Sequence, residues 1–69
     1  MCEEMVHNGN VVGFVMPTSD RSLVADRRGV VRGFIRDSFY DRGGAMPLGY
    51  GLPTRERLAE YLAGADGGV

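Results

Sequence analysis

The sequence has few of the residues that usually reinforce a small domain. One cysteine, Cys2, excludes an intrachain disulfide, and one histidine, His7, leaves no ligand set with the spacing of a zinc site. We therefore expect no metal and no cofactor. A chain of 69 residues is short for a stable core of its own, and such domains usually depend on disulfides, metals or partners. Self-association is the reinforcement that remains, so we expect a homo-oligomer.

Lysine is absent, and all eight basic residues are arginine. Since lysine codons are AT-rich, this bias indicates a GC-rich genome, such as that of an actinobacterium or one of its phages. Nine acidic residues bring the net charge to −1. No overall field therefore favours binding to polyanions.

Long apolar runs are also missing. No segment approaches the roughly 20 apolar residues that span a bilayer, and the first ten residues are acidic and polar, unlike a secretory signal. A free thiol without an export signal fits a reducing compartment. These features predict a cytoplasmic protein with no membrane partner.

Glycine is abundant, and its positions mark turns between valine-rich segments typical of strands. Asn8-Gly9 is the dipeptide preferred by a two-residue type I′ hairpin. Asp26 begins a second turn, in which Gly29 can adopt the left-handed conformation of a longer hairpin with a bulge. Further turns or loops are expected at residues 16–22, 36–39 and 41–44.

The last segment changes to a helical period. Thr54 suits the N-cap, Glu56 lies in the first turn, and Gly64 suits a left-handed C-cap. The spacing predicts a short amphipathic helix over residues 54–63, followed by a flexible tail over 64–69. Its apolar stripe, which should pack on the sheet, consists of Leu58, Tyr61 and Leu62.

The expected fold is mainly β, in a single domain over residues 1–69. Residues 1–52 should form a small antiparallel β-meander or partly open barrel of five or six short strands, built from hairpins. The sixth strand would be the segment after residue 44, where Pro47 predicts an edge strand or a bulge. The C-terminal helix should complete the core.

The chain also repeats itself. "NGNVVGFV" (8–15) and "RGVVRGFI" (28–35) share their glycine spacing, and "GGAMPLGYG" (43–51) is a degraded third copy. The pattern "DRRGVVRGFIRDSFYDRGG…LGYG" resembles the bacterial modules called four-fold beta-flower proteins, over about residues 7–52, and PRC-barrel domains show similar local patterns. The resemblance implies an all-β meander that assembles symmetrically. It implies no catalytic residue.

One strand face interleaves arginine with phenylalanine. Side chains alternate along a strand, so Arg32, Phe34 and Arg36 share a face. If Asp37-Ser38 is a two-residue turn, Arg36 pairs with Phe39 and brings that ring to the same face. The candidate interface or ligand-binding residues are these four and their counterparts in the preceding repeat: Arg32, Phe34, Arg36, Phe39, Val12, Phe14 and Met16.

Two kinds of partner remain open for this face. Arginine stems can cover the rings while a second copy, or another protein, completes the burial. The alternative is stacking of single-stranded nucleic acid or of a nucleotide on the phenylalanines, with arginine on the phosphate. The strand of Val12, Phe14 and Met16 is apolar on both faces. Because a chain this short can hardly cover both faces, self-association is favoured.

Catalytic patterns are weak. His7 has no serine or cysteine partner in its turn, and Glu3 and Glu4 point to opposite faces of a strand. Gly43-Gly44 lacks the lysine and helix of a phosphate-binding loop. The sequence therefore predicts no catalytic residue and no enzyme. We expect a self-associating interaction module, an accessory or structural protein of a phage or a GC-rich bacterium.

Overall fold

A computed structural model describes residues 2–67 as one antiparallel sheet and one helix. The five strands are hydrogen-bonded in their order along the chain, each to the next. This arrangement confirms the predicted mainly-β meander of hairpins with a C-terminal helix. The elements are β1 (Glu3–His7), β2 (Asn10–Pro17), β3 (Ser22–Asp26), β4 (Val31–Ile35), β5 (Phe39–Asp41) and α1 (Arg55–Gly67).

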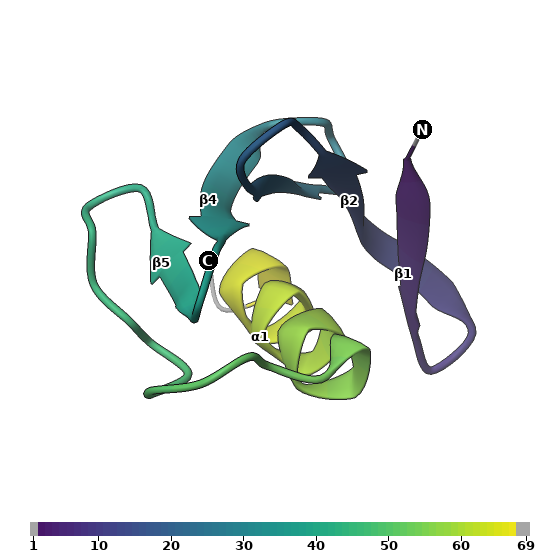
Figure 1. Ribbon diagram of the computed structural model, residues 1–69. Coiled ribbons are helices and arrows are strands. Elements are labelled where there is room, and N and C mark those ends of the chain that lie inside the picture. The colour runs from purple at the N-terminus through teal and green to yellow at the C-terminus, as the bar shows by residue number, and fades with distance from the viewer. Residues whose placement is uncertain (1, 68–69) are drawn as a thin grey trace.

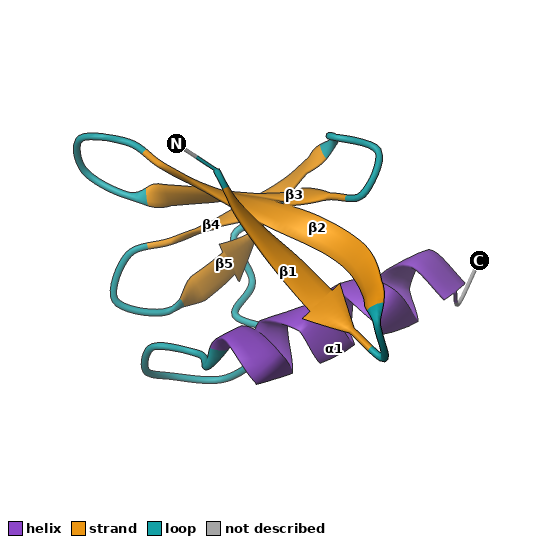
Figure 2. Cartoon of the chain, turned by 90° about the vertical axis from the view of Figure 1, so that its right-hand side faces the viewer, coloured by secondary structure: helices purple, strands orange, loops and turns teal. Residues whose placement is uncertain are grey.

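The sheet is curved, and the helix fills its concave side. Figure 1 shows the strands as an arc over α1, with β1 on one side of the helix and β5 on the other. Figure 2, turned by 90°, shows α1 running beneath the sheet. The helix thus occupies the gap between the first and last strands, where a closed barrel would pair them.

The core lies between the concave face and α1. Leu58 and Leu62 are almost completely buried, and Tyr61 packs at the edge of the cluster with its ring 5.5 Å from that of Phe39. All three residues of the predicted stripe therefore contact the sheet. Burial of a side chain of this size contributes roughly 1.5–3 kcal/mol. The buried apolar cluster comprises Met5, Val15, Val24, Ile35, Phe39, Leu58, Ala59 and Leu62.

The first hairpin has the predicted two-residue turn. His7 pairs with Asn10, and both residues between them have positive φ, 51° at Asn8 and 80° at Gly9. Positive φ at both central positions is what a type I′ turn requires. The Asn-Gly dipeptide therefore sets the register of β1 and β2.

The hairpin between β3 and β4 is organised by Asp26. The Gly29 N–H donates to the Asp26 carbonyl (2.9 Å), and Gly29 has a φ of 82°. Asp26 Oδ1 also accepts hydrogen bonds from the N–H groups of Arg28 (2.9 Å) and Val30 (3.0 Å). The predicted longer turn, with a register shift in the adjoining strands, is confirmed.

The loop after β5 repeats this geometry around Asp41. The Gly44 N–H donates to the Asp41 carbonyl (2.9 Å), and Gly44 has a φ of 87°. Asp41 Oδ1 accepts hydrogen bonds from Gly43 (2.9 Å) and Ala45 (3.0 Å). The Asp-x-x-Gly repeat in the sequence thus forms the same loop twice.

The turn between β4 and β5 has three residues, not the predicted two. Ile35 pairs with Phe39 and Phe34 with Tyr40. A one-residue change of register moves every following side chain to the other face of the sheet. Phe39 is consequently fully buried in the core, whereas the expectation placed it beside Phe34 and Arg36. The core takes the ring without a hydroxyl, and Tyr40 keeps its hydroxyl at the surface, donating to Asp37 Oδ1 (2.8 Å).

Two other expectations about the C-terminal part are wrong. The segment after β5 forms turns and no strand among the described residues, because Gly49 and Gly51 take φ values of 80° and 93° that end an extended chain. The helix does not stop at Gly64 but continues to Gly67. The predicted tail thus begins too early, and its residues 68–69 lie outside the described residues.

Candidate interaction surface

The sheet face turned away from α1 carries a row of large apolar side chains. Met16 pairs with Leu23, Leu23 with Phe34, and Phe34 with Tyr40, so the row crosses β2 to β5. Each of the four is half-buried. Their neighbours Val15 and Val24 point into the core instead, as alternation requires.

Two further rows extend this surface toward β1. Phe14 pairs with Glu4 on one side and Ala25 on the other, and Val6 pairs with Val11. Val6 is 54% exposed. Among the ten residues of the three rows only Glu4 is charged. We call this surface the outer face; it consists of Glu4, Val6, Val11, Phe14, Met16, Leu23, Ala25, Val31, Phe34 and Tyr40, of which Ala25 is itself only 1% exposed.

Phe34 lies at the centre of a stack on the outer face. The Tyr40 ring is nearly parallel to it at 20°, with centroids 5.2 Å apart. The Arg21 guanidinium carbon lies 4.7 Å from the Phe34 centroid. Tyr40 comes from β5 and Arg21 from the residue before β3, the two neighbours of β4, so the ring is flanked from both sides. A nucleobase stacking on Phe34 would have to displace one of them.

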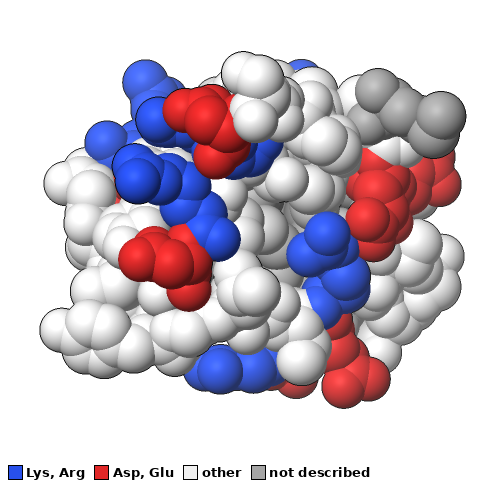
Figure 3. Space-filling model, viewed as in Figure 1, with Lys and Arg blue, Asp and Glu red and all other residues white. Residues whose placement is uncertain are grey.

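Hydrogen bonds to acidic side chains hold polar groups in place around the edge of the outer face, which we call its rim. Arg21 Nη2 donates to Asp20 Oδ2 (3.1 Å), and this bond together with the arginine charge lowers the pKa of Asp20. The hydroxyl of Tyr40 donates to Asp37, which lowers the pKa of Asp37 and raises that of Tyr40. Figure 3 shows basic and acidic side chains intermixed over one side of the molecule. The side of the molecule shown there has no continuous field of one sign.

The predicted interface residues separate into two groups. Phe14, Met16 and Phe34 lie on the outer face, whereas Phe39 is in the core. Val12 packs against the core cluster, so the expectation that it shares a face with Phe14 is also wrong. A register shift between β1 and β2 breaks the alternation at Val12, because Met5 pairs with Gly13 and Val6 already with Val11.

The two arginines of the predicted set have different surroundings. Arg36 is exposed beyond the end of β4. Arg32 is half-buried, and its Nε lies 3.5 Å from Oδ2 of the buried Asp26. Sequence reasoning missed Leu23 and Tyr40, which alternation and the observed register would have placed on the outer face. It also missed Arg21, because no pattern in a loop predicts a contact with a ring on another strand.

Asp26 is a carboxylate that is only 1% exposed. Burial, the largest influence, raises its pKa, but the N–H groups of Val30 and Arg28 and the charges of Arg28 and Arg32 outweigh burial, so the pKa lies below 3.8. Oδ2 has no hydrogen-bond partner within residues 2–67. The turn around Asp26 therefore depends on a charged group held inside the protein.

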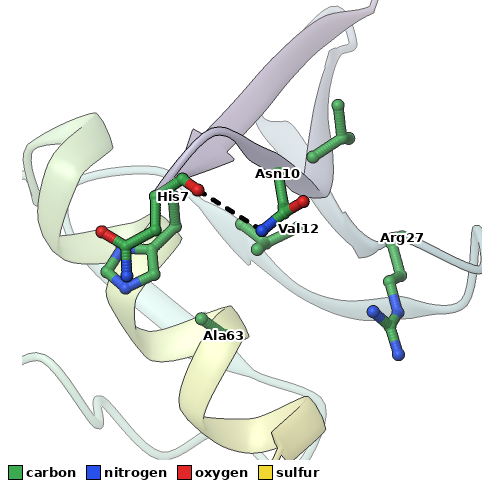
Figure 4. A pocket seen from close by; sticks show the side chains of 7 residues that line it. His7, Asn10, Val12, Arg27 and Ala63 are labelled. Atoms are coloured by element: carbon green, nitrogen blue, oxygen red, sulfur yellow. Dashed lines mark hydrogen bonds between the residues drawn. The ribbon is translucent and has the colours of Figure 1, made fainter.

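His7 lines a hollow of about 370 Å³ between the first hairpin and α1. Figure 4 shows it with Asn10, Arg27 and Ala63; Asn10 Nδ2 donates to the Asn8 carbonyl (3.4 Å). In the part of the chain that the structure describes, no three His, Cys, Asp or Glu side chains come together as metal ligands. None of its helices has the length and apolarity to cross a membrane.

No protein-family model, no curated protein and no solved structure matches the chain.

Proposed function

We propose that this protein is a non-enzymatic interaction module that self-associates through the outer face. The observation that supports this function is the composition of that face, in which nine of ten side chains are uncharged and the aromatic ones are left half-buried. Helix α1 completes the core on the opposite side of the sheet. A contiguous apolar surface rimmed by polar groups is typical of an interaction site.

A second copy of the chain fits this face. With a net charge of −1, two copies repel each other little. In a two-fold symmetric contact, a residue of one copy meets a different residue of the other copy. Arg21, at the edge of the outer face of one copy, can therefore pair with the oppositely charged Glu4 of the other. The resemblance to beta-flower modules also implies symmetric assembly.

The size of the outer face sets the expected affinity. Five strands at about 4.8 Å spacing and five residues per strand at about 3.3 Å give a flat area of roughly 400 Å² on each copy. This is at the low end for protein interfaces, and we expect dissociation constants in the micromolar range.

The alternative is binding of single-stranded nucleic acid or a nucleotide through arginine and phenylalanine. It has less support, because Arg21 and Tyr40 flank Phe34 and Arg32 pairs with Asp26. A role in a phage or a GC-rich bacterium rests on the arginine-only basic composition, and a cytoplasmic location on the single free thiol of Cys2, which fits a reducing compartment.

Sedimentation equilibrium over about 5–500 µM tests self-association, since mass action must favour the oligomer as concentration rises. The mean mass should rise from 7.5 kDa toward at least twice that value. Phe34→Ser should remove the rise. Tyr50→Ser is the matched control, because Tyr50 is 90% exposed and lies outside the outer face.

A second variant separates assembly from folding. Val31 is 38% exposed in the single chain, so Val31→Glu should leave the circular dichroism spectrum unchanged and still abolish assembly. A wild-type chain that stays monomeric at the highest concentration would refute the proposal. Salt-dependent binding of single strands, lost in Phe34→Ser while assembly is kept, would support the alternative instead.

A further inference from the structure

A hollow of about 420 Å³ lies at the end of the sheet where β2 passes into β3 and where β4 ends. Pro17 pairs with Ser22, and Ser22 with Ile35, so these segments lie side by side. The segment leading into α1 forms the remaining wall through Leu52 and Pro53. Its volume falls within the usual range for small-molecule sites, about 300–1,000 Å³.

Three arginines from separate parts of the chain line this hollow. Arg21 comes from the β2–β3 loop, Arg36 from the end of β4, and Arg55 from the first turn of α1. Asp20 is the one acidic residue in the lining, so three positive charges and one negative charge leave a net +2. This local excess contrasts with the net charge of −1 for the whole chain.

Two of the arginines are held in place by other groups. Arg21 is bonded to Asp20 and lies over the Phe34 ring. Arg55 Nε donates to Glu3 Oε2 (2.9 Å), so the two Nη groups of Arg55 do not take part in that bond. Ordering a side chain before a ligand arrives lowers the entropy cost of binding.

The third arginine has unused hydrogen-bonding capacity. Among residues 2–67 the guanidinium of Arg36 makes no hydrogen bond or ion pair, although its charge is one of the influences that lower the pKa of Asp37. The hydroxyl of Ser22, in the same lining, likewise has no hydrogen-bond partner within that range. Both groups are available to a ligand.

We infer that this hollow binds a small phosphomonoester. Arg21, Arg36 and Arg55 would surround the phosphate, and the local charge stays positive, at +1, even when Glu3 beside Arg55 is counted. Guanidinium groups from several directions suit the tetrahedral phosphate, whereas one guanidinium already satisfies both oxygens of a carboxylate. The non-phosphate part of the ligand would lie against Leu52 and Pro53. Binding needs no second copy of the chain, although Arg21 contributes both to this hollow and to the edge of the outer face.

Side-chain NMR spectra of the arginine Nε–H groups can test this site directly. The probes are phenyl phosphate, inorganic phosphate and benzoate, each titrated at constant ionic strength. We expect saturable shifts at Arg21, Arg36 and Arg55 with phenyl phosphate. Inorganic phosphate should bind more weakly, because it lacks the ring, and benzoate at least about tenfold more weakly, because it loses charge-assisted hydrogen bonds.

Matched variants distinguish specific binding in the hollow from general electrostatic attraction to the arginines. Arg36→Gln should weaken phenyl phosphate about tenfold, whereas Arg42→Gln, which removes the same charge outside this hollow, should change it less than about twofold. Leu52→Ser should lower the affinity for phenyl phosphate to that for inorganic phosphate. The affinity for inorganic phosphate itself should not change. The inference is overturned if the shifts do not saturate, if both arginine variants weaken binding equally, or if benzoate binds as tightly as phenyl phosphate.

Discussion

The two Asp-x-x-Gly loops allow burial to be tested with backbone geometry held constant. Asp26 and Asp41 each accept two backbone hydrogen bonds at matching distances, 2.9 and 3.0 Å. The bonds at Asp26 are partly buried and its side chain is 2% exposed, whereas those at Asp41 face water. Truncation to alanine should therefore cost more at position 26 than at position 41.

The expected difference in stability depends on whether water can reach the backbone N–H groups that lose their acceptor. Hydrogen bonds to a charged acceptor contribute about 1.5–3 kcal/mol each, and solvent-exposed ones about 0.5–1 kcal/mol. Allowing for partial access of water, we expect Asp26→Ala to lower the free energy of unfolding by about 3 kcal/mol and Asp41→Ala by about 1 kcal/mol. Asp26→Ala also removes the carboxylate beside Arg32. A domain of this size has only about 3–5 kcal/mol of stability, so Asp26→Ala should be partly unfolded at 25 °C.

Urea unfolding followed by circular dichroism measures both values. If Asp26→Ala is too unstable for a folded baseline, Asp26→Asn serves instead, since an amide oxygen can still accept both N–H bonds while the amide nitrogen faces Arg32. Asp41→Asn is its control and should be close to neutral, because water solvates the new amide. Equal losses at the two positions, for alanine and for asparagine, would refute the reasoning from burial.

Three other predictions concern pH and glycine. The pKa of Asp26 is lowered in the folded state, so its contribution to stability is present above about pH 4 and is lost as the pH falls through the folded pKa. Urea unfolding at pH 7 and pH 3 should therefore show a larger decrease in the free energy of unfolding for wild type than for Asp26→Asn. Gly33→Ala should lower the free energy of unfolding in urea by at least about 2 kcal/mol, because a Cβ there would collide with the Tyr40 carbonyl oxygen. In the control Gly43→Ala, the added Cβ lies 3.5 Å from its nearest neighbour, so stability should change by less than about 0.5 kcal/mol. Gly64→Ala should raise the thermal midpoint and increase the free energy of unfolding by about 1 kcal/mol, because the residue is helical and nothing lies within 4 Å of the added carbon. A lower midpoint would instead support the expectation that Gly64 is the C-cap of the helix.

Features with local causes could be predicted from the sequence. The Asn8-Gly9 turn and the Asp26 loop depend on which residues accept positive φ and which side chains bond nearby N–H groups. The stripe of α1 follows from spacing alone. These elements fix the order of the hairpins and therefore most of the fold.

The register of β5 could not be predicted in this way. Asp37-Ser38 is compatible with a turn of two or of three residues, and the choice depends on which aromatic ring fits the core beside Tyr61. Phe39 fits without burying a hydroxyl, so the three-residue turn is adopted. The outer face was consequently predicted only in part: Phe34 lies on it as expected, whereas Phe39 lies in the core and Tyr40 takes the position beside Phe34.

The position of α1 after all five strands has a consequence for biosynthesis. All five strands precede the helix in the sequence, yet Leu58 and Leu62 provide the cover for Val15 and Val24. A nascent polypeptide that has exposed only its strands must leave these valines in contact with water, where they invite aggregation. Stable structure should therefore arise only after α1 has left the ribosome.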